Sequence, residues 1–189
     1  MFLKNSIIFI FLFIFSCQPV ELIEPVKIEN SLLENIQVNA KNINLNISYN
    51  PIFSEENIED QIKVSPLAII TSWNNENITA FGYENKFEIT ILEAAITKKE
   101  INNNDAKKYE EKTLFKYEVF FLVEYKLYDD SDILIANVSV ESKRTTTSQK
   151  YISLNETDLI ITDLINKTLI DFTKEAKILI KDYMGNYIK

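Results

Sequence analysis

The residue types that carry most enzyme chemistry are scarce in this sequence. Histidine is absent from the 189 residues, and Cys17 is the only cysteine. Ser-His and Cys-His catalysis are therefore excluded, as is every metal site that requires imidazole. Glu88, Glu93 and Glu118 fall on predicted strands, but the sequence shows no pair at the separation that carboxylate hydrolysis requires. We therefore expect no enzymatic activity, no metal and no dissociable cofactor.

Two further polar groups are candidates for binding. Arg144, the only arginine, precedes a Thr/Ser run, where it can contact an anion or form a surface salt bridge. Asp129, Asp130 and Asp132 are spaced closely enough for Ca²⁺. Their segment lacks the glycine and distal glutamate of an EF-hand loop, so it is more typical of a turn between two strands.

The first 16 residues have the layout of a cleavable export signal. Lys4 precedes a short apolar run from Ile7 to Phe15. A permanent membrane span needs roughly 20 apolar residues, whereas a removable signal needs only about half that length. We therefore predict a signal peptide over residues 1–16.

The segment Ile14-Phe15-Ser16-Cys17 resembles the lipobox of bacterial lipoproteins. The resemblance implies cleavage before Cys17, which would then carry a covalent diacylglycerol and an N-acyl chain as a membrane anchor. In such lipoproteins, an aspartate directly after the lipidated cysteine commonly causes retention in the inner membrane. This chain has Gln18 at that position, so the resemblance implies anchoring at the periplasmic face of the outer membrane. The alternative is an ordinary signal peptide followed by an accidental cysteine.

The mature chain is predicted to comprise a lipidated tether over residues 17–32 and one domain over 33–189, a length that suits a single core. After loss of Lys4 it has 28 acidic and 19 basic side chains. Nucleic-acid binding requires clustered cations, so we expect no nucleic-acid partner.

The first half of the domain contains one strand and one helix by periodicity. Alternating apolar residues predict a strand over 36–49, with a bulge near residues 41–42 where the alternation changes phase. Ser65 and Pro66 are typical of a helix start, and Gly82 of a left-handed helix end. We therefore predict a helix over residues 66–81, in which Trp73 packs against a sheet and holds the helix to it.

The second half predicts three strands and a long helix. One strand begins at Phe87, a second covers residues 115–127 and a third covers residues 134–140. The apolar side of the third strand is formed by Leu134, Ala136, Val138 and Val140. Ser153 and Glu156 form a capping box that starts a helix running to about Tyr183, with Gly185 at its end. The order β-α-β-β-β-α predicts an α+β fold in which two helices pack on one face of a four-stranded, largely antiparallel sheet.

The other face of this sheet is less polar than solvent exposure requires. Phe120, Leu122 and Tyr128 lie there among charged residues, and they form either a partner surface or an ordinary semi-polar exterior.

Pro66, Ala68, Trp73, Ala80 and Gly82, followed by an apolar strand and a closing helix, resemble uncharacterised lipoproteins of alphaproteobacteria. The element order is also similar to that of the lipopolysaccharide-assembly lipoprotein. These resemblances imply an accessory or assembly role in the cell envelope through protein–protein contacts. The alternative is a small-ligand or lipid-binding module, with a cavity lined by residues such as Trp73, Phe121, Tyr125 and Phe172.

Overall fold

A four-stranded sheet runs the length of the molecule in the computed structural model, which describes residues 35–52 and 54–189. Its strand order is β2-β4-β5-β6. β4, β5 and β6 form an antiparallel meander, and β2 pairs with β4 in parallel. The strands are β2 (Asn42–Ile47), β4 (Lys86–Asn102), β5 (Thr113–Tyr128) and β6 (Leu134–Gln149).

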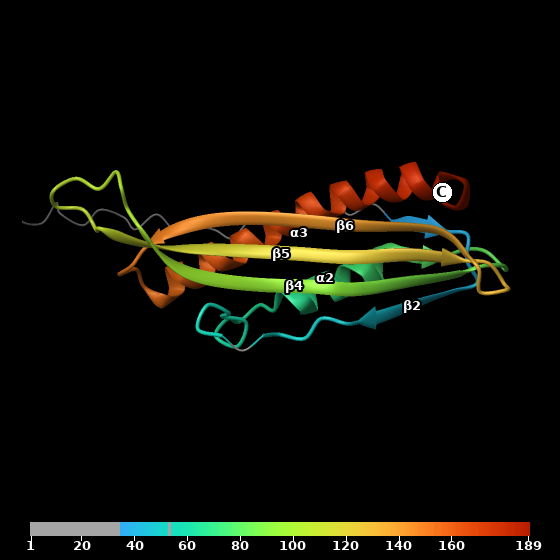
Figure 1. Cartoon of the computed structure of the whole chain (residues 1–189), viewed down its shortest axis with the longest axis horizontal. Coiled ribbons are helices and arrows are strands. Elements are labelled where there is room, and N and C mark those ends of the chain that lie inside the picture. Colours follow the sequence, from blue (N-terminus) through green and yellow to red (C-terminus); the bar gives the residue numbers. More distant parts are fainter. Residues whose placement is uncertain (1–34, 53) are drawn as a thin grey trace, which may run out of the picture.

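Two helices, α2 (Pro66–Asn77) and α3 (Leu154–Met184), pack on one face of the sheet (Figure 1), and a 3-10 turn, η2 (Gly185–Tyr187), follows α3. The predicted α+β class, with a largely antiparallel four-stranded sheet and two helices on one face, is confirmed. The predicted signal peptide, Cys17 and the tether over 17–32 lie outside the described residues. Within the described part, no helix is both long enough and apolar enough to cross a membrane.

The core lies between the sheet and the two helices. Alternate residues of β5 from Tyr117 to Leu127 are buried, as the period of two predicted, and the apolar stripe of α3 covers them. Trp73 of α2 meets Phe172 of α3 edge-on at 5.6 Å between ring centroids, and Phe172 meets Phe121 of β5 at 6.1 Å. Trp73 therefore joins α2 to the sheet through Phe172, which confirms its predicted structural role.

Both helices begin at the predicted caps. The Ser153 hydroxyl accepts a hydrogen bond from the Glu156 backbone N–H at 3.2 Å, and the Glu156 carboxylate accepts from the Ser153 backbone N–H at 2.9 Å. Ser65 caps α2 by accepting from the Ala68 N–H at 3.3 Å, with Pro66 in the first turn. These contacts satisfy backbone donors that a helix start leaves free.

The prediction of one continuous strand over residues 36–49 is wrong. Residues 36–38 form β1 (Ile36–Val38), which pairs in parallel with β3 (Ile78–Ala80) in a separate two-stranded sheet, and β2 begins only at Asn42. The phase change near Lys41 is therefore the point at which the chain passes between two sheets, and not a bulge in one strand.

The predicted end of the first helix is also wrong. α2 ends at Asn77, and residues 78–80 leave it as β3 because pairing with β1 outweighs their weak helical periodicity. Gly82 does not adopt the left-handed conformation. A Cβ at Gly82 would lie 2.0 Å from Asn39 Oδ1 and 3.0 Å from the Ala40 backbone nitrogen. Glycine is needed there for a close approach of two chain segments.

Two residues expected on the core side are instead exposed. Leu134 is 47% exposed, because the β5–β6 register shifts next to the turn, and Tyr183 is 65% exposed near the end of α3. β6 also continues well beyond Val140 to Gln149. Its second half is rich in Ser and Thr and lacks the apolar alternation that reveals a strand.

Candidate functional site: the outer face of the sheet

The sheet face opposite α2 and α3 is turned toward the viewer in Figure 1. Strand alternation places every second residue on this outer face. Its middle contains two neighbouring cross-strand rows. One row joins Ala95, Phe120 and Lys143, and the next joins Glu93, Leu122 and Glu141.

The two rows form a small apolar centre with a charged border. Phe120 and Leu122 are half-buried, and a shallow hollow of about 240 Å³ lies around Phe120, lined also by Glu93, Ala95, Thr97, Glu118 and Lys143. Next to Leu122, β4 contains a bulge between Ile91 and Glu93, and the extra residue, Leu92, is 38% exposed. Bulges commonly redirect side chains at the borders of functional surfaces.

Lysines surround the Glu118 carboxylate at one end of this centre. Glu118 contacts Lys143 at 2.6 Å and Lys116 at 3.5 Å. Partial burial alone raises the pKa of Glu118, but the hydrogen bond and charge of Lys143, together with Lys116, outweigh it and leave the pKa below its ordinary value. Glu118 is therefore a stable anion, unlike a general acid, which needs a raised pKa.

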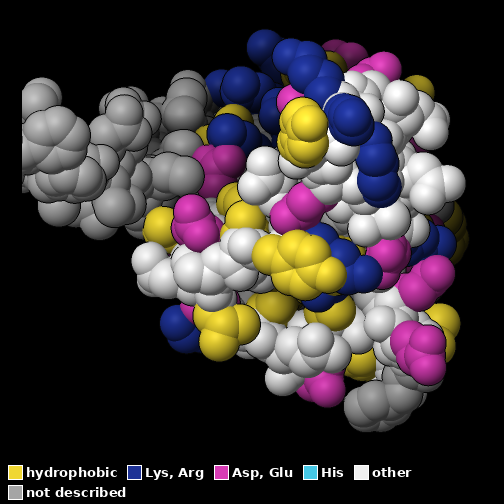
Figure 2. All heavy atoms as spheres, turned by 90° about the vertical axis from the view of Figure 1, so that its left-hand side faces the viewer, with side chains coloured by type: hydrophobic (Ala, Val, Ile, Leu, Met, Phe, Trp, Pro, Cys, Tyr) yellow, Lys and Arg dark blue, Asp and Glu magenta, His cyan; other side chains and the backbone are white. Residues whose placement is uncertain are grey.

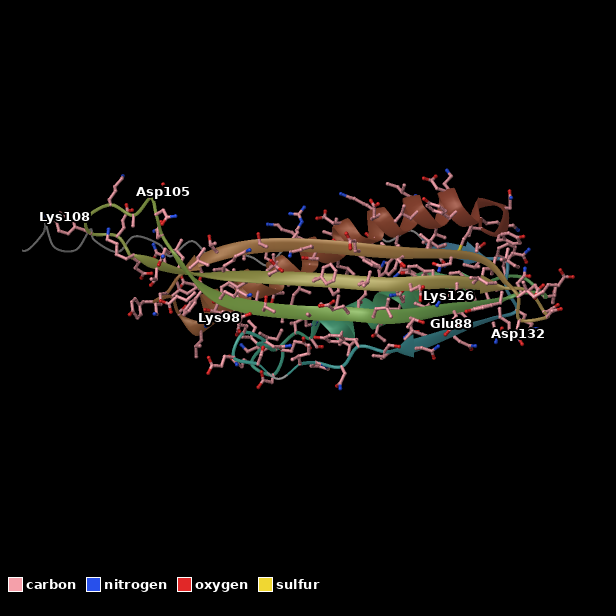
Figure 3. The ribbon with its side chains drawn as sticks, in the orientation of Figure 1. Glu88, Lys98, Asp105, Lys108, Lys126 and Asp132 are labelled. Carbon is pink, nitrogen blue, oxygen red and sulfur yellow. The ribbon has the colours of Figure 1, made fainter. Side chains whose placement is uncertain are left out.

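The other half of the outer face is polar and separates Tyr128 from the apolar centre. Lys126 contacts Glu124 at 2.6 Å, and the Asn46 amide donates to Glu88 at 2.7 Å. Glu88 and Lys126 lie side by side on neighbouring strands (Figure 3). The structure therefore brings Phe120 and Leu122 together, whereas Tyr128 lies six residues farther along β5, about 20 Å away.

The acidic segment between β5 and β6 is a turn, as predicted. Asp129 Oδ1 accepts hydrogen bonds from the backbone N–H groups of Ser131 and Ile133, each at 2.8 Å. Asp130 pairs with Lys41 at 2.7 Å, and Asp132 pairs with Lys86. The three carboxylates thus have local partners and hold the turn against the start of β2 and β4.

Arg144 forms a salt bridge, one of the two possibilities for this residue. Its guanidinium donates to both carboxylate oxygens of Asp171 on α3, with the Nη2–Oδ1 distance at 3.1 Å. An external anion would have to compete with this bidentate contact.

The four aromatic residues proposed to line a ligand cavity instead fill the core. Phe172 contacts both Trp73 and Phe121, and the Tyr125 hydroxyl donates to Asn74 Oδ1 at 2.8 Å. An open hollow of about 710 Å³ lies elsewhere, beside the segment that follows β2. Its lining is Pro51, Ile52, Ser54, Glu55, Asn57, Glu59, Asp60, Gln61, Ser65 and Leu67, which includes none of the four.

The end of the sheet that carries loop 103–112 mixes charges of both signs (Figure 2). Lys150 pairs with Glu100 at 2.9 Å, and its backbone N–H donates to Glu111 at 2.6 Å. Lys98 lies 3.9 Å from the centre of the Phe115 ring. The Glu111 contact attaches the loop, and the Glu100 contact attaches β4, to the connection between β6 and α3, so both contacts have a structural role.

Sequence reasoning found Phe120 and Leu122 but missed the neighbouring residues Leu92 and Ala95. The bulge had a signal in the sequence, because the apolar positions of β4 change phase between Ile91 and Ala94. The position of Ala95 opposite Phe120 had none, because the pairing register of two strands joined by a long loop is not encoded locally.

No known protein family and no curated protein matches the chain. Among solved structures, it is similar to the crystal structure of a minor lipoprotein from Acinetobacter baumannii. The two chains are 12% identical, with a TM-score of 0.34, and the match covers 72% of this chain and 92% of that chain.

Proposed function

We propose that this chain is a lipid-anchored envelope protein with a non-catalytic accessory or assembly role, and that it binds a protein partner through the apolar centre of its outer sheet face. The supporting observation is that the two faces of the sheet differ. One face is covered by α2 and α3, whereas the other has Phe120 and Leu122 at its middle within a border of charges. An apolar centre with a polar rim is the usual anatomy of a protein interface.

The charges around this centre favour binding over catalysis. Glu118 is held as an anion between Lys143 and Lys116, and Glu88 accepts a hydrogen bond from Asn46. Glu93 and Glu141 flank Leu122 and form no ion pair with another described residue. A partner that inserts an apolar side chain beside a lysine or arginine would complement this arrangement.

The test is cross-linking in intact cells with the full-length, acylated chain, followed by mass spectrometry of the co-purifying proteins. Leu122→Arg places a cation between two glutamates, so the fold should be retained while the apolar contact is lost. Ile178→Arg changes an exposed apolar residue of α3 on the other layer and is the matched control.

We expect one stoichiometric partner with the wild type and with Ile178→Arg, and at least a tenfold loss with Leu122→Arg. Equal recovery with both variants would rule out this face as the binding surface. Recovery of the wild-type chain alone would contradict the accessory role itself.

A further inference from the structure

The chain covers one long edge of its sheet and leaves the other without a strand partner among the described residues. β2 pairs with the first half of β4. The segment after β2 continues along the same edge, where Ile58 N–H donates to Ile96 O at 3.3 Å and Lys98 N–H donates to Glu56 O at 2.7 Å. At the opposite edge, β6 pairs only with β5 within the described part of the chain.

The β6 edge lacks the usual protections against pairing. Soluble proteins keep exposed edge strands short, bulged, proline-containing or charged on the inner side, or cover them with a helix or loop. Here α3 packs against the inner side of β6, where the Ser142 hydroxyl donates to the Thr168 carbonyl at 3.1 Å, and no described strand pairs with the outer edge. β6 runs for 16 residues without proline, and its register with β5 is continuous from Ala136 to Gln149. Its inward charge, Arg144, is neutralised by the bidentate contact with Asp171. The edge is therefore a ready template for another strand.

We propose that β6 pairs antiparallel with β6 of a second copy of this chain, about a two-fold axis at Ser142. This axis lies near the middle of the strand, so residues 135–149 of both copies overlap. Side chains of paired residues must share a face, and this register satisfies that requirement throughout. The two four-stranded sheets then form one continuous sheet of both copies.

Charge complementarity selects this register. With the axis at Ser142, each Glu141 lies opposite Lys143 of the second copy, so two opposite-charge pairs form. If the axis lay at residue 141, Glu141 of one copy would face Glu141 of the other. If it lay at residue 143, the two Lys143 side chains would face each other. Either shift therefore places like charges together. Both side chains are exposed, and Glu141 forms no ion pair with another described residue. The Lys143 ammonium already contacts Glu118 at 2.6 Å and can donate to a second carboxylate.

The test measures the molar mass of the full-length chain in detergent by sedimentation equilibrium. The wild type should be a dimer. Glu141→Lys and Lys143→Glu each place like charges opposite one another in both pairs, and each should weaken the dimer by about tenfold or more. An equimolar mixture of the two variants should regain the wild-type affinity, because each supplies the charge that the other lacks.

This mixture also controls for effects within one chain. Lys143→Glu lacks the contact with Glu118 both alone and in the mixture, so recovery of the dimer on mixing must come from the charges between the two chains. A monomeric wild type would overturn the proposal, including the case in which a segment before residue 35 occupies the edge. A dimer that tolerates both single variants would overturn β6 as its interface.

A cross-link tests the register itself. In a Cys17→Ala background, a Ser139→Cys chain mixed with a Thr145→Cys chain should be joined by a short bismaleimide, because these positions face each other. The Ser139→Cys chain alone should remain unlinked, since its two thiols would lie about 20 Å apart. Equal linking in both samples would exclude the Ser142 register. The outcome does not depend on whether a partner binds the outer face.

Discussion

At the residue scale, buried polar groups with fixed partners define how the helices sit on the sheet. The Tyr125 hydroxyl of β5 donates to Asn74 Oδ1 of α2 at 2.8 Å, and the Asn74 amide donates to the Ile70 carbonyl at 2.8 Å. Both side chains are fully buried. A buried donor or acceptor without a partner is costly, so this chain of contacts favours one position of α2 over others.

Tyr125→Phe should lower the free energy of unfolding by about 1–3 kcal/mol at neutral pH, because Asn74 Oδ1 then stays buried without its donor. Urea unfolding measures the change. Tyr83→Phe is the control, since Tyr83 is 96% exposed and its substitution should have little effect. Equal stabilities of the two variants would show that the buried hydrogen bond is unimportant.

The same tyrosine makes stability depend on alkaline pH. Burial raises the pKa of Tyr125 well above its ordinary value of 10.0, while the hydrogen bond with Asn74 opposes the rise. A folded pKa above the unfolded value gives stability that is present below about pH 10 and is lost as the pH rises beyond it. Unfolding measured from pH 8 to 11 should therefore show a steeper loss for the wild type than for Tyr125→Phe. Parallel curves would contradict this assignment.

The two glycines of the chain supply a test substitution and its control. Gly82→Ala should destabilise the fold by about 1–3 kcal/mol, because its Cβ would meet Asn39 and the Ala40 backbone. Gly185→Ala should be neutral or stabilise by up to about 1 kcal/mol, since its φ is −54° and nothing lies within 4 Å of an added Cβ. Thermal and urea unfolding should give opposite or clearly unequal shifts, and equal shifts would contradict the close approach at Gly82.

At the element scale, local patterns were predictable and pairing partners were not. The capping box and the face of β5 follow from side chains close in sequence, so the sequence predicted both. A period of two identifies residues 36–38 and 42–47 as strand, but it does not show that they join different sheets. β6 extends into a Thr-rich segment because Ser142 and Arg144 make polar contacts with α3, so apolar alternation is unnecessary there. The same limit applies to the candidate site, where Phe120 was found from alternation and Ala95 required the register.

The start of α3 supplies a prediction at this scale. Ser153→Ala should lower the free energy of unfolding by about 1 kcal/mol, because the Glu156 N–H loses its acceptor, whereas Ser153→Thr should retain most of the contact. The backbone and side-chain hydrogen bonds from Ser153 lower the pKa of Glu156. Only these bonds to the Glu156 carboxylate depend on pH: their stabilisation is present above the ordinary carboxyl pKa and is lost as the pH falls through the lowered pKa of Glu156, whereas the cap bond from the Glu156 N–H does not titrate. Equal stability of the Ala and Thr variants at pH 7 would argue against the cap.

At the scale of the whole molecule, the described residues form a long sheet with one face covered by helices, and no described helix is long and apolar enough to cross a membrane. We propose that a lipid, and not a helix, anchors this domain. The lipobox-like segment before Cys17 supplies the proposed means. Two or more acyl chains give stable attachment, at about 0.8 kcal/mol per buried methylene. The tether over 17–32 would let the outer face reach a partner away from the bilayer surface.

Palmitate labelling and membrane fractionation test this placement. Cys17→Ala should abolish the label and move the chain out of the membrane fraction, because the acceptor of the lipid is lost. Gln18→Asp should keep the label, yet shift the chain toward the inner membrane, as the lipoprotein resemblance implies. Equal labelling of the wild type and Cys17→Ala would reject the lipoprotein interpretation. Labelled Gln18→Asp with an unchanged distribution would reject only the outer-membrane placement, because anchoring and sorting depend on different residues.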